Sequence, residues 1–257
     1  MKINPFKIEK IRHTLATNRK FDQLVKTYRS TNSYPEIFDL NTSVLWDKLN
    51  WKSPLTPEQN PMAYDRVKIV AGLIPIGYQR ILNIGFGSGD LENEIFKSQA
   101  ANYDWEGIDI SLKSVKNLQR KYPRRKFMIG DVTKLKTPQN PYDGVIIMEV
   151  LEHIRPSKIL YVLARIYSQL KNSGWLILSV PLNEGLEEMM AKNYNPNAHV
   201  RIYSPGLVQA ELEISKFQVQ KQINLYAFHK NYYLKKFLLK FFPWLKAPNN
   251  LIILATK

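Results

Sequence analysis

The chain has 257 residues, with 37 Lys and Arg against 22 Asp and Glu, which gives a formal net charge of +15. Hydrophobic residues make up 44% of it, so the composition is globular and excludes a disordered or collagen-like chain. It contains no cysteine, which excludes disulfide scaffolds, thiol nucleophiles and cysteine-ligated zinc. We expect no metal ligands.

The positive charge is concentrated at the two ends. Residues 1–30 carry 8 basic and 2 acidic side chains, and residues 214–257 carry 8 lysines and no acid. Residues 31–213 are nearly neutral, with 21 basic and 20 acidic side chains. A basic excess suits nucleic acid, an anionic membrane or an acidic substrate. Its distribution points to the ends of the chain for such contacts.

Residues 1–60 are predicted to form a basic, helical N-terminal extension that could close over a site as a lid. A short helix is expected near Leu45–Leu49, among turn-forming prolines. We see neither the ~20 apolar residues of a membrane span nor the apolar core of a signal peptide. The expectation is a cytoplasmic protein, possibly peripheral at the membrane.

From residue 61 onward a single α/β domain is predicted, over 61–257. After a helix from Met62 to about Leu73, short β-rich runs alternate with helical stretches, as in a parallel sheet covered on both faces. The expected strands are Ile81–Ile84, Trp105–Asp109, Lys126–Ile129, Gly144–Met148, Trp175–Val180, Phe217–Leu225 and Leu251–Ala255. The expected helices are Asp90–Ser98, Leu112–Tyr122, Pro156–Leu170 and one that opens at Ser204-Pro205.

A glycine loop follows the first strand, with Gly85, Phe86, Gly87 and Gly89 leading into a helix. Glycine permits positive φ and close approach of a ligand to the backbone. The spacing is G-x-G-x-G rather than the G-x-G-x-x-G of dinucleotide sites, and no basic residue falls within Gly85–Asp90. The loop suits a nucleoside with a cationic sulfonium better than a diphosphate. The alternative is a tight turn that binds nothing.

Acidic residues follow the next two strands. Asp109, beside Ile110, could accept both hydroxyls of a ribose, or could cap the next helix. Asp131 could accept from an adenine amino group, while Val132 supplies a backbone N–H and an apolar contact. The alternative for Gly130-Asp131 is an ordinary turn.

The fourth strand ends in two acids and a histidine. Glu149 is expected near the cofactor, and Glu152 and His153 near the mouth where a substrate enters. The alternative for Glu152 and His153 is local chemistry at a helix start.

These motifs together resemble the class I S-adenosylmethionine-dependent methyltransferases, well over Ile81–Val180 and more loosely to the C-terminus. The branch they resemble contains the ubiquinone-biosynthesis O-methyltransferases and many small-molecule and sugar methyltransferases. The resemblance implies a Rossmann-like, doubly wound, seven-stranded and mostly parallel sheet with an antiparallel last strand. It also implies S-adenosylmethionine as cofactor. Members usually carry Asp or Glu where this chain has Asn83, which would contact the cofactor without contributing charge.

The same resemblance makes the segment from His199 to Pro205 a lining of the substrate pocket. It marks Arg201 and Tyr203 as candidate substrate contacts. The expected reaction is direct in-line methyl transfer to an oxygen of a small-molecule, glycan or lipid-linked acceptor. His199 or His153 would act as base or orienting group, because imidazole titrates in the right range. A capping or shaping role for these histidines is the alternative.

Other functions stay open. A non-catalytic module that keeps the fold to bind a nucleoside or a partner is one, and Asn83 supports it. A nucleic-acid O-methyltransferase is another, less favoured function. Methylation of an amino group on a nucleic-acid base is disfavoured, because it usually calls for an Asn/Asp-Pro-Pro-aromatic motif that is missing here. An NAD-linked oxidoreductase fails on the glycine spacing.

An insertion at residues 226–250, before the last strand, is rich in aromatic residues and lysine. On a helix, Tyr233, Phe237 and Phe241 would share one side. Such a mixture could pack on the core, bind an anionic membrane through residues 226–246, or stack on single-stranded nucleic acid.

Overall fold

The computed structural model describes residues 41–49, 55–77, 79–97, 103–182, 198–228 and 230–257. Residues 1–40, which make up most of the predicted N-terminal extension, lie outside the described residues. The described part of the extension includes helix α3, Ser43–Leu49, close to the short helix expected there. Among the helices of the described ranges, none is long and apolar enough to cross a membrane.

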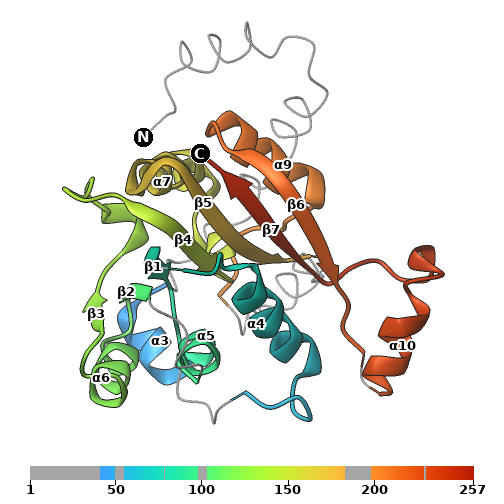
Figure 1. Cartoon of the computed structure of the whole chain (residues 1–257). Helices are drawn as coiled ribbons and strands as arrows, with labels where there is room; N and C mark the ends of the chain where they lie inside the picture. Colours follow the sequence, from blue (N-terminus) through green and yellow to red (C-terminus); the bar gives the residue numbers. More distant parts are fainter. Residues whose placement is uncertain (1–40, 50–54, 78, 98–102, 183–197, 229) are drawn as a thin grey trace, which may run out of the picture.

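Seven strands form one sheet in the order β3-β2-β1-β4-β5-β7-β6 (Figure 1). All neighbouring pairs are parallel except those of β7, which runs antiparallel to both β5 and β6. This confirms the predicted fold class. The strands are β1 Gln79–Ile84, β2 Tyr103–Asp109, β3 Lys126–Ile129, β4 Tyr142–Met148, β5 Leu170–Pro181, β6 Gln218–Leu225 and β7 Asn250–Thr256.

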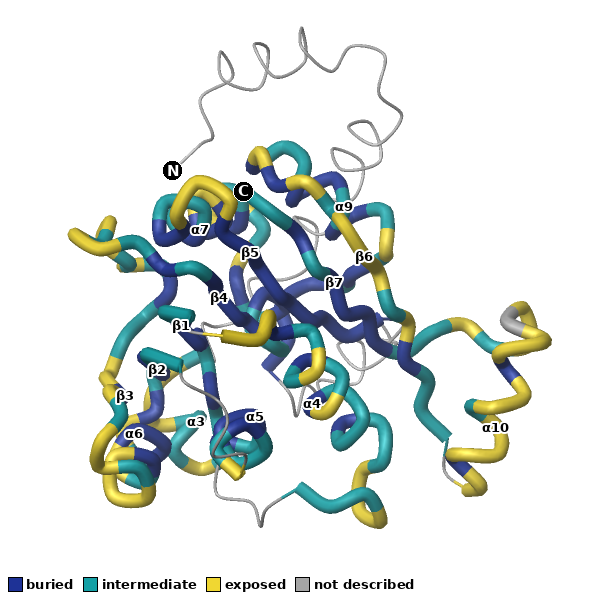
Figure 2. Tube along the Cα trace, in the orientation of Figure 1, coloured by how far each residue is buried: buried dark blue, intermediate teal, exposed yellow. Residues whose placement is uncertain are grey.

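Helices cover the sheet on both faces (Figure 1). One core cluster joins the sheet to α4 Pro61–Leu73, α5 Asp90–Ile95 and α6 Leu112–Lys121. The other joins it to α7 Pro156–Gln169 and α9 Pro205–Ile214. The inner strands of the sheet are largely buried, whereas the edge strands β3 and β6 are mostly exposed (Figure 2). Chain order reverses between β1 and β4, and such a switch point is where ligands bind in open α/β sheets.

One boundary differs clearly from the sequence prediction. The fifth strand was expected to begin at Trp175, but β5 begins at Leu170, directly after α7 ends at Gln169. Leu170 pairs with Tyr142 of β4. The residues between, 171–173, are polar and exposed, so hydrophobic periodicity does not reveal that the strand continues through them.

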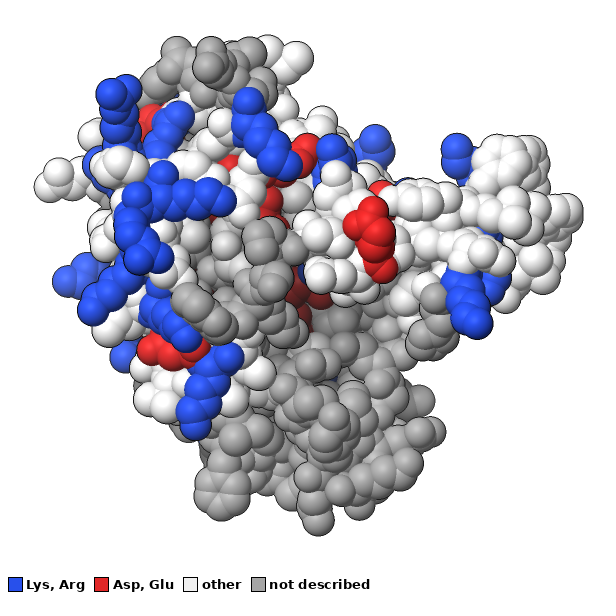
Figure 3. Space-filling view, turned by 90° about the horizontal axis from the view of Figure 1, so that it is seen from below, with Lys and Arg blue, Asp and Glu red and all other residues white. Residues whose placement is uncertain are grey.

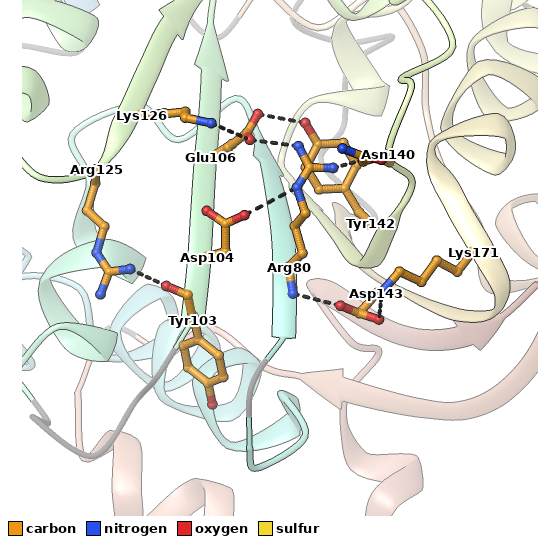
Figure 4. Close-up of polar contacts among 10 residues, drawn as sticks. All are labelled: Arg80, Tyr103, Asp104, Glu106, Arg125, Lys126, Asn140, Tyr142, Asp143 and Lys171. Carbon is orange, nitrogen blue, oxygen red and sulfur yellow. Dashed lines mark hydrogen bonds and ion pairs between the residues drawn. The ribbon is translucent and has the colours of Figure 1, made fainter.

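A charged network ties the early parts of three strands together (Figure 4). Arg80 of β1 pairs with Glu106 of β2 at 2.7 Å, and the hydroxyl of Tyr142 in β4 donates to Glu106 at 2.8 Å. The guanidinium of Arg80 also lies 4.1 Å from the centroid of the Tyr142 ring. Although burial opposes it, hydrogen bonds from Tyr142 and Arg80 hold the pKa of Glu106 below its usual range. The network is part of the scaffold, because none of the three residues lines the main cavity.

Between β6 and β7 the chain leaves the sheet as a protrusion that contains α10, Tyr232–Leu238, and a 3-10 turn, Pro243–Leu245 (Figure 1). The helix expected to carry Phe241 ends at Leu238, so Phe241 lies beyond it. Its ring still contacts that of Phe237, with centroids 5.4 Å apart.

Candidate cofactor and active site

A cavity of about 610 Å³ lies at the carboxyl ends of the strands around the switch point. The glycine turn after β1, the residues after β2 and β3, and the segment after β4 all contribute to it. The predicted site residues in its lining are Gly85, Phe86, Gly87, Asp109, Ile110, Asp131, Val132, Glu149, Glu152, His153 and His199. The predicted residues Asn83, Gly89, Arg201 and Tyr203 are not among the lining residues.

The backbone conformation of the glycine loop requires glycine at three positions. Gly85, Gly87 and Gly89 have φ values of +72°, +56° and +79°, which L side chains rarely adopt. A Cβ on Gly85 would lie 2.3 Å from Cγ2 of Val150, so the loop also packs too closely for a side chain. Gly89 is the left-handed residue before α5 and packs on Leu118. Its role is therefore to shape the turn beneath the cavity.

Asp109 stands where a ribose acceptor was predicted. Its carboxylate is buried and accepts the backbone N–H groups of Gly87 and Ser111, both at 2.8 Å. Burial raises its pKa. The alternative role of helix cap belongs to Ser111, whose hydroxyl accepts from the N–H of Ser114 at 3.1 Å. Asp109 is therefore a cavity residue held against the glycine loop.

Asp131 takes part in a local turn and also lines the cavity. One carboxylate oxygen accepts from the N–H and the hydroxyl of Thr133, at 2.8 and 2.7 Å. The other lies 3.7 Å from the Lys134 ammonium. Val132 beside it is buried. The turn predicted as the alternative is thus present, and it fixes the carboxylate at the cavity wall.

The side chain of Asn83 is turned toward α5. It is 1% exposed, and its side-chain amide donates to Oε1 of Glu92 on α5 at 2.7 Å. Trp105 donates to the same oxygen at 3.2 Å. Burial raises the pKa of Glu92 to about 7. The amide is thus turned toward α5 and Asn83 does not line the cavity, so a direct cofactor contact stays a prediction.

Glu149 is fixed by contacts from three other elements. It has a φ of +52°, and its carboxylate accepts from Ser179 of β5 at 2.8 Å and from Asn250 of β7 at 2.9 Å. Arg66 of α4 pairs with it at 2.8 Å. Sequence reasoning missed Arg66, since one arginine on a predicted helix carries no signal of its own. These contacts hold the Arg66 guanidinium at the wall of the cavity.

Two imidazoles and a carboxylate meet on another wall of the cavity. The rings of His153 and His199 lie 4.8 Å apart, and Oε1 of Glu152 is 3.8 Å from Nε2 of His153 and 4.0 Å from Nε2 of His199. Burial, followed by the proximity of His199, lowers the pKa of His153 to about 3. His153 is therefore a neutral imidazole near pH 7.

These three side chains could hold a metal ion. One ligand atom from each lies within 4.8 Å of the others. Two imidazoles and one carboxylate suit a divalent transition metal. No metal ligands are predicted from the sequence, whereas the fold brings His199, 46 residues further along the chain, next to Glu152 and His153.

Arg201 and Tyr203 were expected to contact substrate, but the structure buries both away from the cavity lining. Arg201 forms an ion pair with Glu211 of α9, and the Tyr203 hydroxyl donates to the same carboxylate at 3.1 Å. The guanidinium also lies 4.4 Å from the Tyr203 ring centroid. Their contacts join the chain after His199 to α9, and the predicted substrate role stays a prediction.

Asn41 and helix α3 contribute side chains to the cavity lining. The sequence did not indicate which residues of this segment would do so. Asn41 donates to the backbone carbonyl of His153 at 2.9 Å, and the Trp46 ring lies edge-on to the His153 ring at 4.7 Å. Asp47 accepts from the Ser111 hydroxyl at 2.6 Å, next to Asp109. The helix is thus attached both beside His153 and beside Asp109.

The cavity fits the parts of S-adenosylmethionine. The glycine loop leaves room for close approach, and Asp109 and Asp131 offer acceptors for hydroxyl and amino groups. Nε of Arg66 is buried and has no hydrogen-bond partner among the described residues. Such a donor suits the carboxylate of the cofactor's methionine part.

Comparison with known proteins gives the same result. Residues 81–174 match a family model described as a methyltransferase domain. A ubiquinone biosynthesis O-methyltransferase of Paracidovorax citrulli (strain AAC00-1) is 30% identical over 142 residues, which cover 52% of this chain and 55% of that protein. The chain thus spans about half the length of this curated relative.

Solved structures share the fold. N-methyltransferase NodS from Bradyrhizobium japonicum WM9, in complex with S-adenosylhomocysteine, has a TM-score of 0.61 and 11% identity, covering 84% of this chain and 98% of that chain. The [4+2]-cyclase SpnF has a TM-score of 0.57 and 17% identity, covering 76% of this chain and 80% of that chain. The chain, with its glycine loop and strand-end acids around one cavity, is therefore similar to the class I S-adenosylmethionine-dependent methyltransferases, over residues 81–174 in sequence and more widely in fold.

Proposed function

We propose that this protein methylates an oxygen of a small-molecule, glycan or lipid-linked acceptor. The observation that carries the proposal is the group of Glu152, His153 and His199 in the same cavity as the glycine loop. An acceptor hydroxyl must lose its proton as it attacks, and a nearby imidazole can take that proton. A nitrogen acceptor would need no such group when it is already neutral.

Bound S-adenosylmethionine would supply a methyl group on an electrophilic sulfonium. Gly85 and Gly87 would let it approach the backbone, Asp109 would accept from the ribose hydroxyls, and Asp131 with Val132 would contact the adenine. Arg66, held by Glu149, would bind the carboxylate of the methionine part. These contacts would fix the methyl group, so that the remaining task is to align the acceptor and exclude water.

The two histidines would have different roles toward the acceptor. A pKa of about 3 makes His153 a weak base, so it would orient the acceptor through a hydrogen bond. His199 would take the proton. Oε1 of Glu152 lies 4.0 Å from Nε2 of His199 and would offset the charge that develops on that ring.

A second role for the same group is to bind a divalent cation that holds and acidifies the acceptor hydroxyl. The donor set and the 4.8 Å spacing support this role. In that case both imidazoles act as neutral ligands, and the lowered pKa of His153 favours ligation. Removing divalent cations with a chelator, then restoring them one at a time, separates this role from that of a general base.

The acceptor class is supported by the name of the curated relative, a ubiquinone biosynthesis O-methyltransferase. A lipid-linked acceptor would be met at a membrane surface. Residues 226–246 carry the exposed aromatic and lysine side chains that such a surface requires. A cytoplasmic location, with peripheral attachment to the membrane, fits this proposal.

Other functions are distinguished by ligand binding and by the preferred methyl acceptor. A non-catalytic module with this fold, or an enzyme with another reaction, is a live alternative because the similar SpnF fold is described as a [4+2]-cyclase. Failure to bind S-adenosylhomocysteine in calorimetry would favour a non-catalytic partner-binding module. Methylation of RNA ribose in preference to small acceptors would favour the nucleic-acid O-methyltransferase.

The test is methyl transfer from labelled S-adenosylmethionine to a panel of phenolic quinone precursors, with and without prenyl tails, and to glycans. We expect an O-methyl product, and we expect His199→Ala to lower kcat by about 10²–10⁴-fold while S-adenosylhomocysteine affinity stays within about threefold. Lys116→Ala is the control, because Lys116 is exposed and lies outside the cavity lining. Transfer only to nitrogen acceptors, unaffected by His199→Ala, would contradict the proposal.

A further inference from the structure

The protrusion between β6 and β7 is anchored to the domain at its base. Asn249 accepts from the N–H of Ala227 at 2.9 Å, and its own N–H donates to Leu225 at 2.8 Å. The Tyr232 hydroxyl donates to Asp65 of α4 at 2.8 Å, and Lys236 pairs with the same carboxylate. The segment therefore holds a defined position beside the sheet (Figure 1).

The outer part of the protrusion exposes large apolar side chains. Tyr233 is 57% exposed and Trp244 is 74% exposed, whereas Tyr232 and Leu239 are buried. The other exposed members are Leu234, Phe237, Leu238, Phe241, Phe242 and Leu245. Figures 2 and 3 show the segment projecting from the body, with a largely uncharged surface and lysines at its edges. An exposed apolar group of this size marks an interaction surface.

A second cavity, of about 530 Å³, lies at the base of this surface. Its lining includes Lys230, Lys235 and Lys246 around Phe228. The ammonium groups of Lys235 and Lys246 lie 5.7 and 4.9 Å from the centroid of the Phe228 ring. Residues 214–257 contain no Asp or Glu, and the neighbouring Asp65 is already paired with Lys236. Three lysines around one hollow offer a site for a phosphate group.

We propose that this protrusion docks on an anionic phospholipid bilayer, with a lipid phosphate held by Lys230, Lys235 and Lys246. Aromatic and leucine side chains would enter the interfacial layer, and the lysines would meet the headgroups. The apolar and the cationic side chains that such docking needs are neighbours in the sequence: Leu234 precedes Lys235, and Leu245 precedes Lys246.

Single-stranded nucleic acid fits the same surface less well. Base stacking needs open ring faces, but the Phe237 and Phe241 rings pair edge to face, as do those of Phe242 and Trp244 at 5.7 Å. The leucines between them cannot stack on bases. Both features suit a lipid surface.

The test is flotation of the full chain with vesicles of phosphatidylcholine alone and of phosphatidylcholine with 30% phosphatidylglycerol. We expect binding to the anionic vesicles at low salt, and weaker binding as salt rises. The triple variant Lys230→Ala, Lys235→Ala, Lys246→Ala should lower the partition coefficient on the order of 100-fold, because each lysine contributes about a factor of five. Phe237→Ser with Trp244→Ser should weaken binding at all salt concentrations.

The control variant Lys116→Ala, Lys136→Ala, Lys221→Ala removes the same charge from exposed positions elsewhere. Its binding should fall by less than about threefold. No flotation with anionic vesicles at low salt, equal losses in the two triple variants, or binding of a single-stranded oligonucleotide in place of vesicles would each overturn the proposal. Vesicle binding is measured without cofactor, so this outcome is separate from that of methyl transfer.

Discussion

The side-chain amide of Asn83 donates to the buried carboxylate of Glu92 at 2.7 Å. Asn83 stands where the methyltransferases that the chain resembles usually have an acid, and Glu92 brings an acid next to it from the first turn of α5. Burial raises the pKa of Glu92 to about 7, because a charge there is poorly solvated. An acid at position 83 would face this carboxylate directly and repel it when both are charged. The asparagine instead donates a hydrogen bond to Glu92.

Glu92 should make stability depend on pH. Its folded pKa of about 7 lies above the usual 4.5, so the folded state holds a proton that the unfolded state releases. Its contribution is present in full below pH 4.5 and is lost as pH rises from there through 7, by roughly 3 kcal/mol. We expect Glu92→Gln to flatten this slope in urea unfolding at pH 5.5, 7 and 8.5.

Asn83→Asp serves as the companion variant. It places a second acid 2.7 Å from Glu92 and should lower stability most at high pH, where both would be charged. An unchanged pH slope in Glu92→Gln would show that another group causes the dependence.

Asp109→Ala should abolish measurable binding of S-adenosylhomocysteine in calorimetry. The carboxylate is aligned by the Gly87 and Ser111 N–H groups, and two charged hydrogen bonds to a ribose contribute about 1.5–3 kcal/mol each. The expected loss is therefore about 10²–10⁴-fold. Asp109→Asn, which keeps the shape, should lose less. Unchanged affinity in both variants would refute the ribose assignment.

Much of the fold follows from local sequence patterns. The strands up to β4 are apolar runs that end in glycine or acid, and their alternation with helices predicts a parallel sheet. The place of Gly85, Asp109 and Asp131 in the cavity lining could be predicted as well, because Gly85 directly follows β1, Asp109 ends β2 and Asp131 lies two residues after β3. Parallel strands bring such positions to one edge without any long-range information.

The rest depends on contacts between distant parts of the chain. Arg66 meets Glu149 across 83 residues, and no periodicity in α4 distinguishes that arginine from a solvated one. Arg201 has the residue type expected of a substrate contact, but Glu211 on α9 captures it. The orientation of Asn83 likewise depends on Glu92. In each case the partner of a polar side chain decides its role.

Glu106→Gln should destabilise the domain by about 1–3 kcal/mol near pH 7, because it removes the charge that Arg80 pairs with at 2.7 Å. The pKa of Glu106 is lowered, so its contribution is present above its usual pKa and is lost as pH falls through the folded value. The difference between the wild type and the variant should therefore shrink toward pH 3 in urea unfolding. Tyr142→Phe, which removes only one hydrogen bond, should cost less and follow the same trend. A difference that is constant with pH would contradict this role of the carboxylate charge.

Arg66→Ala should weaken binding of S-adenosylhomocysteine by about 10–150-fold, the value of one charged hydrogen bond of 1.5–3 kcal/mol. Methylthioadenosine lacks the amino-acid part, so its affinity should change by less than about twofold in the same variant. Asp109→Ala should weaken both ligands, because both carry the ribose. The paired comparison separates a contact with the carboxylate from general damage to the cavity, which would lower both affinities in Arg66→Ala.

Glu149→Gln keeps the hydrogen bonds from Ser179 and Asn250 but weakens the contact that holds Arg66, so it should show the same selectivity between the two ligands with a smaller loss of affinity. Equal losses for the two ligands in Arg66→Ala would place the carboxylate of the cofactor elsewhere in the cavity.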